Sequence, residues 1–179
     1  MPPDNPSQDQ PSDQLDDATL EFAAKMFDLA RNGDAENLET YLAGGLPPNL
    51  RDHKGDSLLM LAAYHGHDAA VKVLLQHKAD PGLRNNNGQT PIAGAAFKGH
   101  MAVVQCLLDN GADVEGASPD GKTALMIAAM FNRKEIVELL LANGANINAR
   151  SDNGATALEA ARAMGAPDTV ALLVARQAT

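Results

Sequence analysis

The sequence matches itself when it is shifted by 33 residues. This shift aligns four glycines with one another and, two positions later, four hydroxyl residues. The glycines are Gly55, Gly88, Gly121 and Gly154, and the hydroxyl residues are Ser57, Thr90, Thr123 and Thr156. A constant period across most of a chain is typical of a repeat array, in which each unit is stabilised by packing on its neighbours. The period therefore limits the possible folds before any residue is assigned a chemical role.

Each copy of the repeat has the pattern of two short helices joined by a tight reversal. The Ser or Thr after the turn is placed to cap the first helix, and Pro91 occupies the first helical position of one copy, where a missing N–H costs nothing. An alanine pair such as Ala95 and Ala96 precedes Gly99, and glycine accepts the left-handed backbone that reverses the chain. Val, Leu and Ile dominate the returning helix. The pattern predicts an all-α solenoid of about five stacked helix-turn-helix units with protruding turns.

Composition and the period together predict the domain organisation. Residues 1–16 are mostly Pro, Gln, Ser and Asp, which favours a disordered acidic leader, and residues 17–179 are expected to form the repeat domain. Within this domain we expect an end unit at 17–51, repeats at 52–84, 85–117 and 118–150, and a second end unit at 151–179. The first helix is expected at about residues 19–31, with Asp16 or Asp17 as its cap. Its apolar stripe would contain Leu20, Phe22, Ala23, Met26, Phe27 and Ala30.

The acidic composition excludes some classes of partner. A formal net charge of -9 and a pI near 4.8 argue against nucleic acid or an anionic membrane as the partner. No apolar run approaches the roughly 18 residues of a membrane span. The amino-terminal residues lack the basic start and apolar stretch of a signal peptide, so a cytoplasmic location is expected. The single cysteine, Cys106, lies in an apolar helical segment and is expected to be a buried, inert thiol.

No catalytic or metal-binding constellation is visible in the repeats. The repeated hydroxyl residues are accounted for as helix caps, which leaves no nucleophile paired with a base. The five histidines do not have the convergent spacing of a ligand set. We therefore expect a non-enzymatic protein with no cofactor and no metal. Haem or metal binding through His53, His65 or His77 is the alternative, which a haem titration followed by absorbance would test.

Residues 52–67, and the copies that begin at Asn87 and Asn143, resemble the ankyrin repeat family. The resemblance covers about residues 19–177 and implies a stack of helix pairs with a concave face, usually a protein-binding structure without catalysis. It also implies that His67 and His100, which follow the break glycines, tie successive turns together. The sequence departs from the family at Lys78, where the other units have glycine. Only Pro91 keeps the family's helix-starting proline, and the turn histidine is replaced by Met60, Ala93, Met126 and Glu159.

Three of the six aromatic residues lie at the ends of the first helices of successive units. In the architecture that the resemblance implies, these positions face the concave side together with the turn tips. The alternative is that the rings pack beneath the next turn as part of the core. The residues predicted to bind a partner are Arg31, His53, Lys54, Asp56, Tyr64, His65, Asn86, Asn87, Gln89, Phe97, Lys98, Asp120, Lys122, Met130, Phe131 and Met164.

The sequence thus favours a protein–protein interaction module that binds an unidentified protein partner and is a monomer when unbound. Burying four large apolar side chains would contribute about 10 kcal/mol. Association costs an estimated 4 to 15 kcal/mol, so the turn tips must add contacts and select the partner. The alternative function is an accessory chaperone or inhibitor of a partner enzyme, which would assist cofactor loading or cover an active site.

Overall fold

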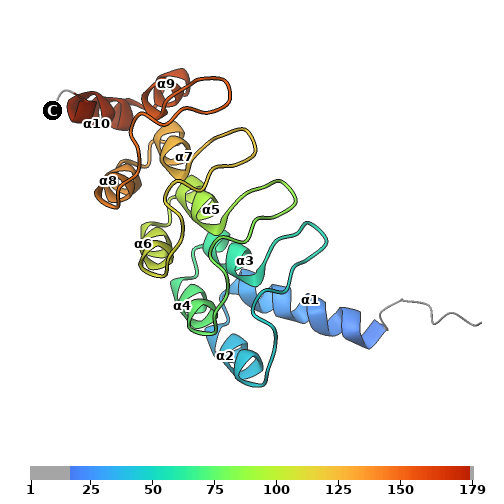
Figure 1. Cartoon of the computed structure of the whole chain (residues 1–179). Helices are drawn as coiled ribbons and strands as arrows, with labels where there is room; N and C mark the ends of the chain where they lie inside the picture. Colours follow the sequence, from blue (N-terminus) through green and yellow to red (C-terminus); the bar gives the residue numbers. More distant parts are fainter. Residues whose placement is uncertain (1–16, 178–179) are drawn as a thin grey trace, which may run out of the picture.

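The computed structural model describes residues 17–177, and over that range the chain forms ten helices and no regular strand. The helices are α1 (Asp17–Asn32), α2 (Ala35–Ala43), α3 (Leu58–His65), α4 (Asp68–Gln76), α5 (Pro91–Lys98), α6 (Met101–Asp109), α7 (Ala124–Met130), α8 (Lys134–Ala142), α9 (Ala157–Ala163) and α10 (Pro167–Gln177). They stack in two rows, with the odd-numbered helices forming an inner row from whose side the long turns project (Figure 1). The predicted all-α solenoid is confirmed. The predicted leader, residues 1–16, lies outside the described residues.

Each inner helix after α1 begins at one of the hydroxyl residues that the period aligned. The Ser57 hydroxyl accepts a hydrogen bond from the Met60 N–H at 3.1 Å, and the Thr90 and Thr123 hydroxyls accept equivalent bonds. A cap of this kind satisfies an N–H group that has no partner within the helix and is worth about 1 kcal/mol. Thr156 completes a capping box, because the Glu159 carboxylate accepts a bond from the Thr156 N–H at 2.7 Å. Glu159 therefore stabilises the start of α9, a contact that the sequence analysis missed.

Histidine rings connect the units of α3 and α5 to the units before them. The His67 Nε2–H donates to the Arg31 carbonyl at 2.8 Å, and the His100 Nε2–H donates to the Tyr64 carbonyl at 3.2 Å. These bonds satisfy carbonyl groups at the ends of α1 and α3, and they confirm the predicted role of both histidines. A Cβ atom at Gly66 would come within 2.6 Å of the His100 ring, and the φ angle of Gly66 is 81°. Glycine is thus required there for both backbone conformation and space.

The core consists of small and medium aliphatic side chains between the two rows of helices. The paired alanines of α3, α5 and α7 are fully buried, which allows the inner helices to approach closely. Leu74, Leu107 and Leu140 occupy equivalent buried positions on the outer helices. Cys106 is buried as predicted, and burial raises the pKa of its thiol. A raised thiol pKa lowers the fraction of reactive thiolate, which agrees with a structural role.

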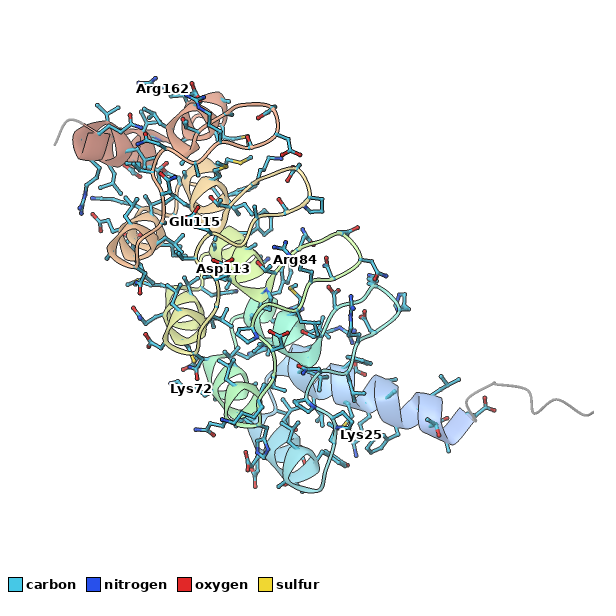
Figure 2. All side chains as sticks on the ribbon, viewed as in Figure 1. Lys25, Lys72, Arg84, Asp113, Glu115 and Arg162 are labelled. Atoms are coloured by element: carbon cyan, nitrogen blue, oxygen red, sulfur yellow. The ribbon has the colours of Figure 1, made fainter. Side chains whose placement is uncertain are left out.

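The two ends of the array differ from the interior. The exposed Arg162 on α9 stands where α5 and α7 have buried alanines (Figure 2). At the other end, α1 starts at Asp17, and its first turns project past the stack (Figure 1). The predicted apolar stripe of α1 is therefore partly wrong, because Leu20 and Phe22 are 51% and 44% exposed. The reason is a difference in length: α1 has 16 residues and its neighbour α3 only 8.

We predict that Lys78→Gly raises the stability of the protein. Lys78 has a φ angle of 68°, and it is the one position in its turn series without glycine. A side chain in this conformation costs on the order of 1 kcal/mol, and glycine removes the cost. Thermal unfolding followed by circular dichroism should show a Tm higher by roughly 2 to 4 °C.

Asn132→Gly provides the matched control, for which we expect a change in Tm of the opposite sign. Asn132 also has a positive φ angle, 56°, but its side-chain oxygen accepts the N–H groups of Asp168 and Thr169 at 3.0 and 3.2 Å. Glycine would relieve the backbone strain and remove the cap of α10, so we expect a lower Tm. Equal shifts for the two variants would contradict this explanation.

Candidate functional site

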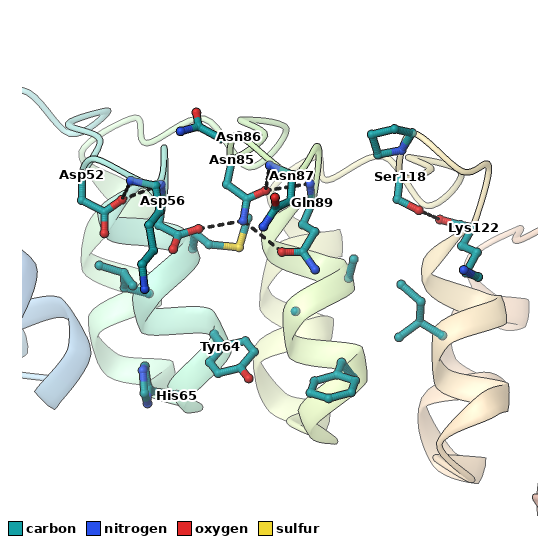
Figure 3. A pocket seen from close by; sticks show the side chains of 18 of the residues that line it. Asp52, Asp56, Tyr64, His65, Asn85, Asn86, Asn87, Gln89, Ser118 and Lys122 are labelled. Carbon is teal, nitrogen blue, oxygen red and sulfur yellow. Dashed lines mark hydrogen bonds between the residues drawn. The ribbon is translucent and has the colours of Figure 1, made fainter. Parts of the chain in front are cut away.

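An open groove of about 1190 Å³ runs along the inner row of helices, below the turn tips. Its floor comes from α3, α5 and α7, and polar side chains of the tips form its upper rim (Figure 3). Tyr64 and His65 lie at the opposite ends of the helices from these tips (Figure 3). The predicted residues that line this groove are Arg31, His53, Lys54, Asp56, Tyr64, His65, Asn86, Asn87, Gln89, Phe97, Asp120, Lys122, Met130 and Phe131.

Three aromatic rings form a continuous row in the groove. Tyr64 and Phe97 are stacked with ring centroids 6.3 Å apart, and Phe97 meets Phe131 edge to face at 4.5 Å. Tyr64 and Phe131 are 38% and 37% exposed, and Phe97 is half-buried. The rings are therefore not sealed in the core, although Phe97 contributes to packing. Edge-to-face and offset rings hold one another in place, so this apolar surface exists before any partner arrives.

Two predicted residues do not line the groove. Lys98 places its Nζ over the Tyr64 ring, 5.1 Å from the centroid, which is the geometry of a cation–π contact. Met164 caps the end of α9 and is 51% exposed beyond the last lining residues. Both residues lie in register with groove residues. Lys98 borders the row of rings, whereas Met164 lies one unit beyond that row.

The tips are shaped by a polar residue that recurs at the start of each turn. The Asp52 carboxylate accepts the N–H groups of Lys54 and Asp56, both at 2.9 Å. The Asn85 side-chain oxygen accepts those of Asn87 and Gln89 at 3.0 and 2.9 Å. Such bonds fix a tight turn without help from a partner. Sequence reasoning did not include Asp52, Asn85 or Ser118 in the site, although their spacing of 33 residues was a signal that would have found them.

Neighbouring tips are also hydrogen-bonded to one another. The Asn86 N–H donates to the Lys54 carbonyl at 3.0 Å, and the Asp152 N–H donates to the Asp120 carbonyl at 3.1 Å. Pro119 occupies the equivalent position between these two pairs and has no N–H to donate. Its ring instead lies over Gly88, where a Cβ atom would come within 2.3 Å of it. The rim is thus built from two bonded pairs of tips with a packing contact between them.

Several basic side chains lie near His65, where α1 meets α3. Partial burial lowers the pKa of His65, and repulsion from the nearby His67, Arg31, Lys98 and His100 lowers it further. The His65 ring stacks on that of His67 at 6.2 Å. The Arg31 guanidinium is paired with the Asp28 carboxylate, one turn earlier on α1, at 2.6 Å.

At the other end of the groove, Asp120 lies between two donors. The Lys122 ammonium and the Ser118 hydroxyl both bond its carboxylate, and they lower its pKa to about 2. Asp120 therefore stays ionised at any physiological pH. The charge of Lys122 is paired with it, so this tip carries little net charge.

Within the described range 17–177, no helix is long and apolar enough to cross a membrane. In the same range, no group of three or more His, Cys, Asp or Glu side chains converges on a point where a metal ion would be held.

Comparison with known proteins gives two findings. A family model described as ankyrin repeats (3 copies) matches residues 26–117 and residues 115–179. A curated protein of Pseudomonas aeruginosa, whose name describes it as an ankyrin repeat protein, is 62% identical to this chain over 65 residues. That alignment covers 36% of this chain and 38% of the relative, so it spans well under half of the relative's length.

We predict that His65→Gln removes a loss of stability that the wild-type protein shows on mild acidification. The pKa of His65 is lowered in the folded state, so the unfolded state binds its proton more readily below the ordinary value of about 6.5. The destabilisation is therefore absent above that pH and grows as the pH falls through the interval down to the folded pKa. Urea unfolding at pH 8 and pH 5 should show that the free energy of unfolding of the variant rises relative to that of the wild type at pH 5 only. A difference independent of pH would contradict this account.

Proposed function

The chain belongs to the ankyrin repeat family, and we propose that it is a binding module whose groove and turn tips hold a protein partner. Ankyrin repeats are generally protein–protein interaction modules, and the family is typically non-enzymatic. The observation that supports this site best is the row of Tyr64, Phe97 and Phe131, because the rings offer partly exposed apolar area inside a polar rim. Aromatic side chains in such settings often supply most of the binding free energy.

Preorganisation of the groove favours tight binding at low entropic cost. The tips are fixed by bonds within each turn, such as those of Asp52 and Asn85, and by bonds between turns. A surface that is already ordered loses little conformational freedom on association. The polar tip residues would then select the partner, because an unpaired amide or charge is costly when the wrong partner buries it.

We predict that Phe97→Ala combined with Phe131→Ala weakens partner binding more than it weakens the fold. Loss of two rings from a binding surface should reduce affinity by more than tenfold, since each aromatic hot spot contributes about 2 kcal/mol or more. The fold should persist with a lower Tm, because Phe97 is only half-buried and Phe131 is partly exposed. Affinity pull-down from cell extract, with retained proteins quantified by mass spectrometry, compares the variant with the wild type.

Phe22→Ala is the matched control for this experiment. Phe22 is 44% exposed and packs edge-on against Tyr41 at 5.6 Å, away from the groove. It should leave binding unchanged. If the double variant is folded and retains the same partners in the same amounts, the groove is not the binding face.

The accessory-protein role predicts a further effect on the partner. A chaperone or inhibitor would co-purify in fixed proportion with one enzyme and change its turnover, whereas a scaffold would leave turnover unaltered. Measuring the activity of a captured enzyme with and without this protein separates the two roles.

A further inference from the structure

We propose that the groove receives an extended peptide segment with an acidic residue at the end of the groove where Lys54 and His65 are unpaired, and a large apolar residue, about three positions away, in a hollow above Gly94. This inference rests on the proposed function and specifies the partner's chemistry. Two features of the groove carry it: unpaired basic side chains at one end and a missing side chain in the floor.

At the end of the groove near α1, the acidic side chains of Asp52 and Asp56 are already engaged, whereas those of Lys54 and His65 are not. Asp52 accepts two backbone N–H groups and lies 3.7 Å from Arg31, and Asp56 accepts the Asn85 amide at 2.8 Å. Within residues 17–177, neither the Lys54 ammonium nor the His65 ring has a hydrogen bond or ion pair. Both line the groove. A carboxylate of the partner would pair with the Lys54 ammonium or accept a hydrogen bond from the His65 ring, which donates an N–H even when it is neutral.

The hollow is produced by a glycine that the fold does not need. Gly94 lies in the interior of α5, in register with Leu61 and Ile127 on the neighbouring inner helices. It has no left-handed φ angle, and an added Cβ would lie 3.5 Å from the Tyr64 ring and 3.7 Å from the Met60 sulfur, which are ordinary contacts. Glycine inside a helix lowers stability relative to alanine. Its presence on the groove floor is accounted for if a partner's side chain fills the space.

The separation of the two features sets the spacing in the partner. Lys54 and His65 belong to the unit of α3, and Gly94 to the adjacent unit of α5. Packed helices lie about 8 to 10 Å apart, and an extended chain advances about 3.3 Å per residue, so the acidic and apolar residues should be about three positions apart. The row of rings continues toward Phe131, where further apolar residues of the same segment would pack.

A random peptide library tests this chemistry directly, because it does not require the natural partner to be identified. Twelve-residue peptides displayed on phage are panned against the wild-type protein, and the affinities of enriched peptides are then measured by fluorescence anisotropy. We expect Asp or Glu about three positions from Leu, Phe, Ile or Trp in the enriched sequences. Affinity should fall by about tenfold or more in Gly94→Leu, which fills the hollow, and in the double variant Lys54→Glu with His65→Glu.

Two further variants keep the result interpretable. Lys134→Glu makes the same kind of charge change at the exposed start of the outer helix α8 and should leave affinity within about twofold. Gly94→Ala should raise the Tm and weaken binding by a smaller factor than Gly94→Leu. Circular dichroism of each variant establishes that it is folded, so a failure of Gly94→Leu to fold would still leave Gly94→Ala as the test of the hollow.

The outcomes separate this inference from the proposed function. Enriched peptides that need Phe97 and Phe131 but are basic, or that bind equally to the folded Lys54/His65 and Gly94 variants, would overturn the inference alone. Peptides that bind equally to the Phe97/Phe131 double variant would overturn the groove as the binding face, and with it both proposals. Recovery of no binders would also count against a groove that receives extended peptides.

Discussion

The close approach of neighbouring inner helices is the constraint on which the other features depend. Fully buried alanines such as Ala62, Ala95 and Ala128 leave only a thin layer of side chain between one unit and the next. No unit has enough apolar surface to form a core by itself, so burial of these faces requires the stack. A larger side chain at any of these positions would separate two units and would strain the hydrogen bonds that join them, such as that of His100 to the Tyr64 carbonyl.

Stacking at one period brings equivalent residues into rows, and these rows form the surface that we propose a partner contacts. The caps fix where each inner helix begins, and the break residues fix where it ends, so tips align on one side and helix ends on the other. Within the row of helix ends the chemistry changes along the array, from Arg31 through Tyr64 and Phe97 to Met130. The scaffold is therefore repetitive, while the surface that it displays is specific and directional.

The sequence identified most of the groove because a position in one repeat predicts the face of the same position in the next. Tyr64, Phe97 and Phe131 were placed together by register, and the structure brings their rings into contact. Asp52 and Asn85 were missed for a different reason: their role is to accept hydrogen bonds within their own turn, and they line the groove as a consequence. Lys98 was in register with the groove residues, but its side chain lies over the Tyr64 ring. This conformation depends on a neighbour in another unit.

The helices, their caps, the left-handed reversals and the order of stacking can all be read from the amino-acid sequence, because each depends on residues within one unit or on the period that relates units. Which side chains remain exposed, and which ones meet, depends on tertiary packing. The exposure of Leu20 and Phe22 follows from the different lengths of α1 and α3, and the hollow above Gly94 follows from what Tyr64 and Met60 leave unfilled. Such features arise between units, where the lateral offset of helices and the rotamers of facing side chains set the surface, and neither is encoded in a local pattern.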